Sequence, residues 1–481
     1  MARIELISSA YDGKSIIASG QECVNLYAEI NSKDPQAPAK TTYYPTPGSE
    51  LYADPLFSHI ARGAYRTSIG TAYYVVGQNV YFLSTAGILI FIGAIADRPS
   101  QIIFADNGIV AVLVDGVNGY VIDLQTNAIG IITDPNFYGA DFVVQLDTFF
   151  VFNYPDTNFF YITVSNADYT LLTTTGAFDP LDIAAKAGLN DPIVGLATVH
   201  KELWLIGDLT TEVWIGTGAA DFYFQLVQGA YINHGCAAPF SIATTDILVF
   251  FIMQDMAGNG IIVQGSGYEL KEISTPRVVS LIKKYSTLSD AIGFCFQIED
   301  HAFYALIFPT ASKGWLYDLT NEQWCEWNWV DDNGNFLRPR ANCFMFANNE
   351  LLVGDWENGR LLRLDDDLFT DDGQPITWVR TFPHMNNNND KTSYKSFDLD
   401  IQVGTITDDS DPQVSLSWSD NKGVSYGNPV MQSLGKTGEY KTVPAWNRLG
   451  LARDRVFKVS SSAAMLTSLN GGFTEAVKAT T

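Results

Sequence analysis

The sequence has few of the residues that most often carry chemistry. Its 481 residues include five histidines (His59, His200, His234, His301, His384) and five cysteines (Cys23, Cys236, Cys295, Cys325, Cys343). No two histidines have metal-ligand spacing, and no CxxC pair, HExxH, G-x-S-x-G or P-loop pattern occurs. We therefore expect no metal, no cofactor and no catalytic residue, with the cysteines reduced in the core.

Positive charge is also scarce. The chain has 29 Lys and Arg against 53 Asp and Glu, a net charge of −24. The whole excess lies in residues 1–389, with 43 acids and 19 bases, because residues 390–481 contain ten of each. Such a charge argues against sequence-specific binding of nucleic acid. It favours either plain solubility or a surface that does not adhere to a polyanion passing by.

Long apolar runs are missing. The longest, GILIFIGAIA (Gly87 to Ala96), has ten residues, far fewer than a membrane-spanning helix needs. The first residues, MARIELISSAYDGK, contain no apolar stretch of the length that a signal peptide has. We expect no membrane span and synthesis in the cytosol.

What the chain does have is a hairpin pattern that occurs seven times. Each copy joins two runs of β-branched and aromatic residues by a polar turn, and the copies start about 35 to 54 residues apart. This spacing is typical of the four-stranded blades of a β-propeller. The seven copies are Tyr73 to Phe82, Gly108 to Ile122, Thr148 to Ile162, Glu202 to Ile215, Ile247 to Gln264, His301 to Leu319 and Asn349 to Leu364.

The pattern predicts an all-β protein with a propeller over residues 63–375. We expect seven blades, with six or eight also possible. Further strands are expected at 87–94, 128–133 and 222–227, and short helices at 178–189, capped by Asp179, and at 274–286. Residues 1–62 contain prolines and few hairpin signals, so we expect an extended N-terminal arm that lies over a neighbouring subunit or completes the last blade.

The end of the chain predicts a second domain. Residues 376–395 are polar enough for a linker, and residues 396–481 alternate apolar and polar residues as a β-sandwich does. The acidic run Asp365, Asp366, Asp367, Asp371 and Asp372 could bind a hard cation, but its spacing matches no known calcium loop. A solvated linker is the simpler interpretation.

Two features leave a glycan-related function open. Ser419 to Tyr426 is a softened form of the S-x-D-x-G-x-T-W turn of sialidase-type propellers, where that turn is structural. The tryptophans Trp315, Trp324, Trp327 and Trp329 could form a sugar platform, although their alternation also fits packing in a core. A scaffold propeller of cellular origin is disfavoured, because regular WD or kelch signatures are missing.

Several segments, in the same order, resemble a known family. GDLTTEVWIGTG (Gly207 to Gly218) is similar to the G-x-x-T-x-E-x-W and T-G turn of podophage tail nozzle proteins, also called packaged-DNA stabilisation proteins or tail hubs. INHGCAAPFSIA (232–243), GYELKEISTPRVVSLIKKYS (267–286), LSWSDNKGVSYG (416–427) and RLGLARDRVFKV (448–459) resemble later segments of that family. The residues that carry the resemblance best are Gly207, Thr211, Glu212, Trp214, Gly218 and Gly235.

This resemblance implies a structural protein of the virion tail, made in the bacterial host, with no catalysis. It implies a homohexameric ring below the portal and adaptor rings, which holds packaged DNA in its channel without sequence-specific binding. It also implies that the ring supports tail spikes or fibres and a plug or needle.

One basic segment stands out in this acidic chain. Residues 436–458 have six bases against two acids. We expect Arg448, Arg453, Arg455 and Lys458 to face an acidic surface, either the neighbouring propeller or the adaptor ring. The alternative is an ordinary strand surface.

Overall fold

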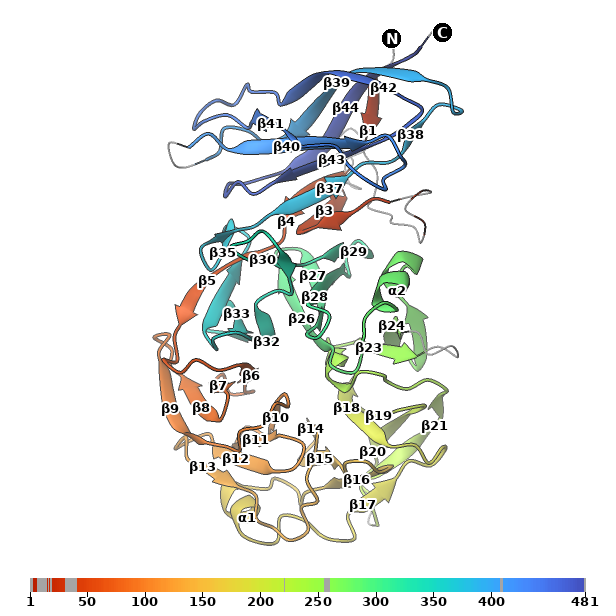
Figure 1. Cartoon of the computed structure of the whole chain (residues 1–481). Coiled ribbons are helices and arrows are strands. Elements are labelled where there is room, and N and C mark those ends of the chain that lie inside the picture. The colour runs from red at the N-terminus through yellow and green to blue at the C-terminus, as the bar shows by residue number, and fades with distance from the viewer. Residues whose placement is uncertain are drawn as a thin grey trace.

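The computed structural model describes residues 3–6, 15, 17, 20–30, 41–219, 221–254, 260–406 and 410–479. They form a ring of seven blades with a β-sandwich packed on one side of it (Figure 1). The predicted propeller and C-terminal sandwich are therefore confirmed, and the ring has seven blades among the described residues.

Each blade is an antiparallel sheet of four strands. Blade 1 comprises β6 (Ala61–Arg66), β7 (Ala72–Val76), β8 (Asn79–Leu83) and β9 (Leu89–Ala94). Blade 2 comprises β10 (Ile103–Asp106), β11 (Val110–Val114), β12 (Gly119–Asp123) and β13 (Ile129–Ile131), and blade 3 comprises β14 (Val143–Leu146), β15 (Phe149–Asn153), β16 (Phe159–Ile162) and β17 (Ile183–Ala185). Blade 4 comprises β18 (Ile193–Val199), β19 (Glu202–Gly207), β20 (Thr211–Gly216) and β21 (Phe224–Ile232).

The remaining blades complete the ring. Blade 5 comprises β22 (Ala243–Thr244), β23 (Val249–Gln254), β24 (Gly260–Ser266) and β25 (Glu269–Glu272); blade 6, β26 (Ile292–Ile298), β27 (His301–Phe308), β28 (Lys313–Asp318) and β29 (Gln323–Glu326); blade 7, β32 (Ala341–Ala347), β33 (Glu350–Asp355), β34 (Leu361–Asp365) and β5 (Gly48–Ala53). A small hairpin, β30 (Trp329–Val330) and β31 (Phe336–Leu337), lies between blades 6 and 7.

The seven hairpins of the sequence are the second and third strands of the seven blades. These strands are almost wholly apolar because both of their faces are covered by the neighbouring blades: all five residues of β7 and of β11 are buried. The first strand of each blade contacts the first strands of the two adjacent blades, so these strands surround the centre of the ring.

The ring is closed by a strand from the other end of the chain. β5 pairs antiparallel with β34, from Ala53 opposite Leu361 to Gly48 opposite Asp365. Blade 7 is also joined to blade 1, because the Asn342 side chain donates to the Ala61 carbonyl at 2.7 Å and the Tyr74 hydroxyl donates to the Gly359 carbonyl at 3.0 Å. The first and last blades are thereby locked together.

The sandwich has two sheets. One contains β1 (Arg3–Leu6), β3 (Leu26–Ile30), β4 (Thr41–Pro45), β44 (Leu469–Lys478), β39 (Thr392–Ile401) and β42 (Ala445–Ala452). The other contains β2 (Cys23–Val24), β37 (Trp378–Thr381), β43 (Asp454–Ser461), β40 (Gln413–Ser419) and β41 (Val430–Ser433), with β38 (Met385–Asn386) beside β43. The second sheet continues through β2 into blade 6, because β2 pairs with both β29 and β37.

The N-terminal segment therefore belongs to both domains, and Asn25 is the residue that joins them. Its side chain donates to the carbonyls of Asn328 and Thr377, both at 2.9 Å, and accepts from the Asn328 N–H at 2.8 Å. Its own N–H donates to the Glu326 carbonyl at 2.8 Å, and its carbonyl accepts from the Thr46 N–H at 3.0 Å. Asn25 is buried with φ at +53°, a conformation that asparagine tolerates better than most residues.

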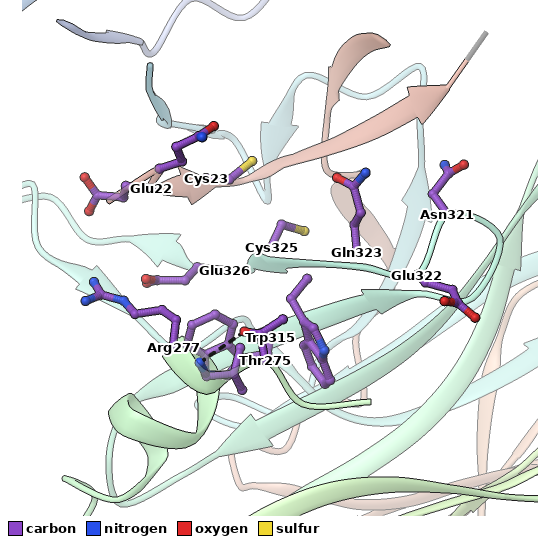
Figure 2. Close-up of a pocket in the computed structure, with 13 residues that line it drawn as sticks. Glu22, Cys23, Thr275, Arg277, Trp315, Asn321, Glu322, Gln323, Cys325 and Glu326 are labelled. Carbon is purple, nitrogen blue, oxygen red and sulfur yellow. Dashed lines mark hydrogen bonds between the residues drawn. The ribbon is translucent and has the colours of Figure 1, made fainter. Parts of the chain in front are cut away.

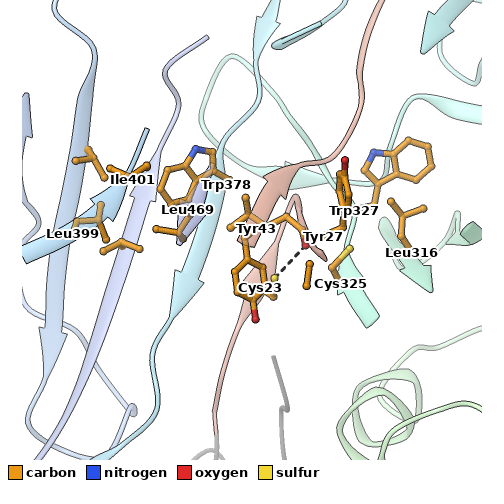
Figure 3. Packing of buried hydrophobic residues seen from close by; sticks show 14 of the residues in the cluster. Cys23, Tyr27, Tyr43, Leu316, Cys325, Trp327, Trp378, Leu399, Ile401 and Leu469 are labelled. Atoms are coloured by element: carbon orange, nitrogen blue, oxygen red, sulfur yellow. Dashed lines mark hydrogen bonds between the residues drawn. The ribbon is translucent and has the colours of Figure 1, made fainter. Parts of the chain in front are cut away.

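The apolar core is continuous across the two domains. One cluster contains Phe303, Leu316 and Trp327 of the propeller side together with Trp378 and Leu399 of the sandwich. Figure 3 shows Tyr27 of β3 and Tyr43 of β4 between Leu316 and Trp327 on one side and Trp378 and Leu399 on the other. The domains consequently share one interior and are not separated by a linker.

The structure differs here from the expected linker at 376–395. All four residues of β37 are buried in the sandwich, because the stretch Ile376 to Phe382 is mostly apolar and completes the sheet beside β2 and β43. The acidic run before it is not a free linker either: β35 (Thr370–Asp371) pairs with β5 and with β36 (Gln374–Pro375). The Asp371 carboxylate accepts a 2.7 Å hydrogen bond from Ser49, and burial raises its pKa to about 6.

One of the two expected helices is confirmed. α2 (Pro276–Ile282) begins at Thr275, whose hydroxyl accepts from the Val278 N–H, with Pro276 in its first turn. The helix expected at 178–189 is wrong: this segment contains β17, because blade 3 needs a fourth strand and pairing with β16 outweighs the helix preference of its alanines. A short helix that the sequence did not indicate, α1 (Tyr169–Thr173), is capped by Asp168, and a 3-10 turn spans Pro239–Ser241.

Replacing Asn25 tests whether this residue holds the two domains together. Asn25→Ala would leave two carbonyls and one N–H unpaired in the interior and put alanine at a positive φ, at about 1–3 kcal/mol for each unpaired group. We expect a loss of several kcal/mol, measured as a lower midpoint of thermal unfolding.

The matched control is Asn349→Ala. Asn349 has a φ of +63° but lies exposed in the β32–β33 turn. Asn349→Ala should lower the free energy of unfolding by about 1 kcal/mol, which is the effect of the backbone conformation alone. Equal effects of the two substitutions would contradict the role given to Asn25.

Candidate functional sites at the blade and domain junctions

The residues of the family-like motif form a buried polar network between blades 3 and 4. Lys186 follows β17, and its ammonium donates to Asp191 at 2.7 Å and to the carbonyl and hydroxyl of Thr210 at 2.8 and 2.9 Å. Asp191 also accepts from the N–H groups of Leu209 and Thr210. Burial alone would raise the pKa of Asp191, but its hydrogen bonds, led by that from Lys186, hold the pKa below its usual value.

Glu212 is the centre of the same network. It is fully buried, and its carboxylate accepts from the N–H groups of Ala187 at 3.0 Å and Gly188 at 2.6 Å and from the Trp214 indole N–H at 3.0 Å. The Trp214 ring stands edge-on to Phe160 of blade 3, with 5.1 Å between the ring centres. The T-x-E-x-W pattern therefore joins the outer end of blade 3 to the β19–β20 hairpin.

The other motif residues lie around the same β19–β20 hairpin. Thr211 donates to the His234 carbonyl at 2.9 Å. A β-carbon at Gly207 would lie 2.2 Å from the Lys186 ammonium, and one at Gly235 would lie 2.3 Å from the Gly207 carbonyl oxygen, so neither position has room for a side chain. Gly218 has φ at +69° in an open turn. The motif residues therefore have a structural role, because hydrogen bonding and close packing determine which residue types fit at these positions.

The four basic residues expected at an interface have different environments. Arg448 and Arg453 are exposed on β42 and on the turn after it. Lys458 is half-buried and pairs with Glu22 at 3.3 Å. Arg455 points into the sandwich, where it pairs with Asp420 at 2.7 and 2.8 Å, donates to the Leu449 carbonyl and lies over the Tyr394 ring. Arg448 and Arg453 are thus the two exposed bases of the four, and Arg453 also donates to the Asn389 carbonyl.

The sialidase-like segment is a closed turn. The Asn421 side chain accepts from the Ser425 N–H at 2.9 Å, and Ser419 accepts from the Gly423 N–H at 2.9 Å. Asp420 is engaged by Arg455. The polar groups of this segment are used to connect β40 and β41.

The four tryptophans considered as a sugar platform do not lie together on an open surface. Trp315, Trp324 and Trp327 are buried, and the indoles of the first two donate to the Tyr285 hydroxyl and the Ile273 carbonyl. Trp329 is half-buried beneath Arg340, 4.8 Å from the guanidinium carbon to the ring centre. Their arrangement does not favour glycan binding.

An open pocket of about 320 Å³ lies where the N-terminal segment passes blade 6 and α2 (Figure 2). Figure 2 shows Glu22 and Cys23 facing Glu326 and Cys325 across it. Burial raises the pKa of Cys23 to about 11 and raises that of Cys325, so both thiols are poor nucleophiles. Burial also raises the pKa of Glu326. The remaining lining residues are Gln21, Thr275, Arg277, Val278, Trp315, Asn321, Glu322, Gln323 and Trp324.

A second cavity, of about 270 Å³, collects acidic residues where the sandwich meets blades 6 and 7. It is lined by Glu29 of β3, Glu299 and Asp300 of the β26–β27 turn, and Asp366 and Asp367 after β34. The charge of Asp366 raises the pKa of Glu299, and burial raises the pKa of Asp366. Like charges from both domains are therefore held close together here.

Beside these acids a polar contact fastens the sandwich to blade 6. His301 is buried and hydrogen-bonds to Asp318 at 2.8 Å, which raises its pKa. Tyr27 of β3 stands edge-on to the His301 ring at 5.1 Å, and the Asn321 side chain donates to the Ala28 carbonyl at 2.6 Å. His301 therefore has a structural role at the junction of the two domains.

Neither metal sites nor spanning helices are found in the part of the chain that the structure describes. Within it no group of three or more His, Cys, Asp and Glu side chains is arranged to hold a metal ion. The described helices also include none that is long and apolar enough to cross a membrane.

Two family models match almost the whole chain. The model described as "Bacteriophage P22 Gp10, beta-propeller" matches residues 19–369, and "Bacteriophage P22 Gp10, beta-sandwich" matches residues 377–476. The chain belongs to the bacteriophage P22 Gp10 family. It is a structural protein of a podophage tail, of the nozzle or hub type, involved in stabilising packaged DNA. The family-model matches imply a structural role.

The other comparisons found only low similarity. No curated protein matches the chain. Among solved structures, a streptogramin B lyase is 9% identical with a TM-score of 0.44, over 66% of this chain and 98% of the lyase. The Cps50 (Swd1) β-propeller domain of Myceliophteria thermophila is 7% identical with a TM-score of 0.42, over 64% of this chain and 96% of that domain.

Sequence reasoning missed the residues that make the junctions. Lys186 and Asp191 lie in a loop without periodicity, and Asn25 lies in a segment with few strand signals. The only available signal was the T-x-E-x-W motif, which indicated a family but not the partners of Glu212.

Glu212→Ala tests the network between blades 3 and 4. The substitution would leave two N–H groups and an indole N–H without an acceptor in the interior, so we expect a loss of about 3–5 kcal/mol and a clearly lower unfolding temperature. The control is Glu322→Ala, which removes an exposed carboxylate 2.6 Å from the exposed Lys271. That change should cost less than about 1 kcal/mol, and a similar cost for both would refute the network.

The acidic cavity predicts a pH dependence. A carboxyl group whose pKa is raised by folding binds its proton more tightly in the folded state. Its contribution to stability therefore rises as the pH falls through that raised pKa, and becomes constant below the unfolded value of about 4.3. Glu299→Gln should raise the unfolding temperature at pH 7 by about 1 °C, a small effect because Glu299 is exposed, and should make no difference near pH 4.

The control for this pH effect is Glu269→Gln on the exposed strand β25. It should leave the difference between pH 7 and pH 4 unchanged. If Glu299→Gln lowered the stability at pH 7, the repulsion inferred from the cavity would be wrong.

Proposed function

We propose that the protein forms a homohexameric ring below the portal and adaptor rings of a short-tailed phage. In this ring it extends the DNA exit channel, retains the packaged DNA and anchors spikes or fibres and a plug or needle. The observation that carries the proposal is the pair of family matches, which together cover residues 19–369 and 377–476. The protein is made in the host cytoplasm and acts in the virion tail.

The charge of the chain supports a channel that DNA passes without being held by its phosphates. A protein that neutralises phosphates with Lys and Arg binds DNA more tightly with each contact. Residues 1–389 instead carry 43 acids and 19 bases, and several of those bases are buried, including Arg62, Lys186 and Arg340. Such a surface repels DNA and keeps it mobile.

The continuous core supports a mechanical role, in which force passes between the two domains. A ring that retains DNA must transmit force between its domains without bending. Here the sandwich and blade 6 share one sheet, and β5 and β2 belong to one short segment. A subunit with one interior resists domain motion better than two domains on a linker.

The experiment that tests the proposal is electron microscopy of the purified protein, alone and mixed with the portal–adaptor complex. Six-fold rings, or six subunits added at the tail end of that complex, are expected. Monomers that never join the complex would overturn the proposal.

The exposed arginines of the sandwich give a sharper test. Arg448→Glu with Arg453→Glu should weaken assembly on the adaptor or between subunits by about tenfold or more, because two bases become acids facing an acidic surface. The control is Lys283→Glu with Lys284→Glu at the end of α2, the same change of charge at two other exposed positions. Normal assembly of the Arg448/Arg453 variant would rule out this interface. Arg455 is left unchanged because its loss would unfold the sandwich.

A further inference from the structure

The outer side of blades 1 and 2 carries exposed apolar side chains, which we call the blade 1 face. It consists of Ile88, Ile90, Phe91 and Ile131, each about half exposed, with Phe91 at 56%. Blades 7, 1 and 2 meet here: Tyr52 of β5 lies against Gly87, and Ile129 of β13 against Gly93 of β9. Figure 1 shows β5, β9 and β13 following one another along the outer margin of the ring.

This face is almost without charge, which is unusual in a chain of net charge −24. No Asp, Glu, Lys or Arg occurs from Thr67 to Ala96, a stretch that includes β7, β8 and β9, nor from Leu124 to Thr133, which includes β13. An apolar surface of several adjacent residues in a soluble protein marks a contact with another molecule.

The outer strands of the other blades are protected in recognisable ways. β25 carries Glu269, Lys271 and Glu272, and β29 and β5 are covered by β2 and β35. β17 has three residues, and β21 is interrupted around Gly229, which has a positive φ. β9 has six residues, no charge and a single unpaired residue, Ile92, whereas β21 leaves four residues unpaired. β13 beside it has only three residues, so among the described outer strands β9 is the longest uncharged one with nearly complete pairing.

The sandwich of the same chain offers a matching projection. Residues 436–443 form an exposed loop in which Tyr440 is 69% exposed and Val443 also faces solvent, with Lys436 and Lys441 on either side of Tyr440. Glu439 also lies in this loop, and its carboxylate accepts from the Lys436 N–H. The lysines are attracted by the acidic propeller of a second copy, while the tyrosine and valine can pack on a surface that carries no charge. An exposed tyrosine between basic residues is typical of the anchor of an interface.

We propose that the blade 1 face binds the 436–443 loop of a second copy of this chain. Asp97, exposed three residues after β9 and 3.8 Å from His59, supplies a carboxylate for one of the lysines. Since the two surfaces differ, the contact is head-to-tail and repeats from copy to copy, as a ring requires. The proposal rests on the ring assembly proposed above and names the two surfaces that form it.

Cysteine cross-linking tests the contact directly. Ile90→Cys combined with Tyr440→Cys should give disulfide-linked dimers and higher oligomers under mild oxidation in the assembled tail complex. The native cysteines are buried or half-buried and interfere little. Leu209→Cys with Tyr440→Cys, which moves one cysteine to an exposed position on blade 4, should give none. Cross-linking of the control pair alone, or of neither pair in rings that form normally, would overturn the proposal.

A second variant measures the strength of the contact. Phe91→Asp places a charge in the middle of the face and should weaken ring assembly about tenfold or more, with an unchanged unfolding temperature because Phe91 is exposed. Phe159→Asp, at an exposed phenylalanine of blade 3, is the matched control and should assemble normally. Rings that form equally well with Phe91→Asp would refute the contact and leave the ring itself established. If the unaltered protein formed no ring on the portal–adaptor complex, the proposed function would fail instead.

Discussion

The structure depends on the hydrogen bonds of one short N-terminal segment, and above all on those of Asn25. Every polar group of this residue, in the backbone and in the side chain, is paired, and its partners come from blade 6, from the start of the sandwich and from β4. Asn25 fixes β2 between β29 and β37. About twenty residues further on, β5 closes the ring of blades. Neither domain is complete without this segment.

This arrangement has consequences for folding. The side-chain partners of Asn25, Asn328 and Thr377, lie more than 300 residues away along the chain, and so does the β34 partner of β5. Contacts of such separation form late, because the loops that they close cost entropy before the contacts are gained. The blades, whose strands are local hairpins, can form first, and the N-terminal segment can join them only when blade 7 and the sandwich exist. We expect a cooperative last step that fixes ring and sandwich together.

The fold was predictable from the sequence where the pattern is local, and the sites were not. The buried second and third strands of the seven blades appear in the sequence as apolar runs such as Tyr73 to Val76. These runs alone indicate a propeller. The partners of Asn25, Glu212 and Arg455 come from distant segments, so no periodicity could reveal them. Arg455 is instructive: in the sequence it is one of six bases in a basic segment, yet cation–π contact with Tyr394 and a bidentate pair with Asp420 place it inside. The failure at 178–189 has the same origin, because the need of blade 3 for a fourth strand is a property of the whole sheet.

Several of the scarce bases of this chain are used as internal connectors, and this links the fold to the proposed function. Arg62 donates to the carbonyls of Gly77, Ala96 and Ser100 inside blade 1; Arg340 pairs with Asp355 inside blade 7. A guanidinium can join three strand ends at once because its donors diverge in a plane. A buried base that donates only to carbonyls, as Arg62 does, neutralises no carboxylate at the surface, so the propeller stays acidic. Rigidity and repulsion of phosphate both suit the ring proposed above.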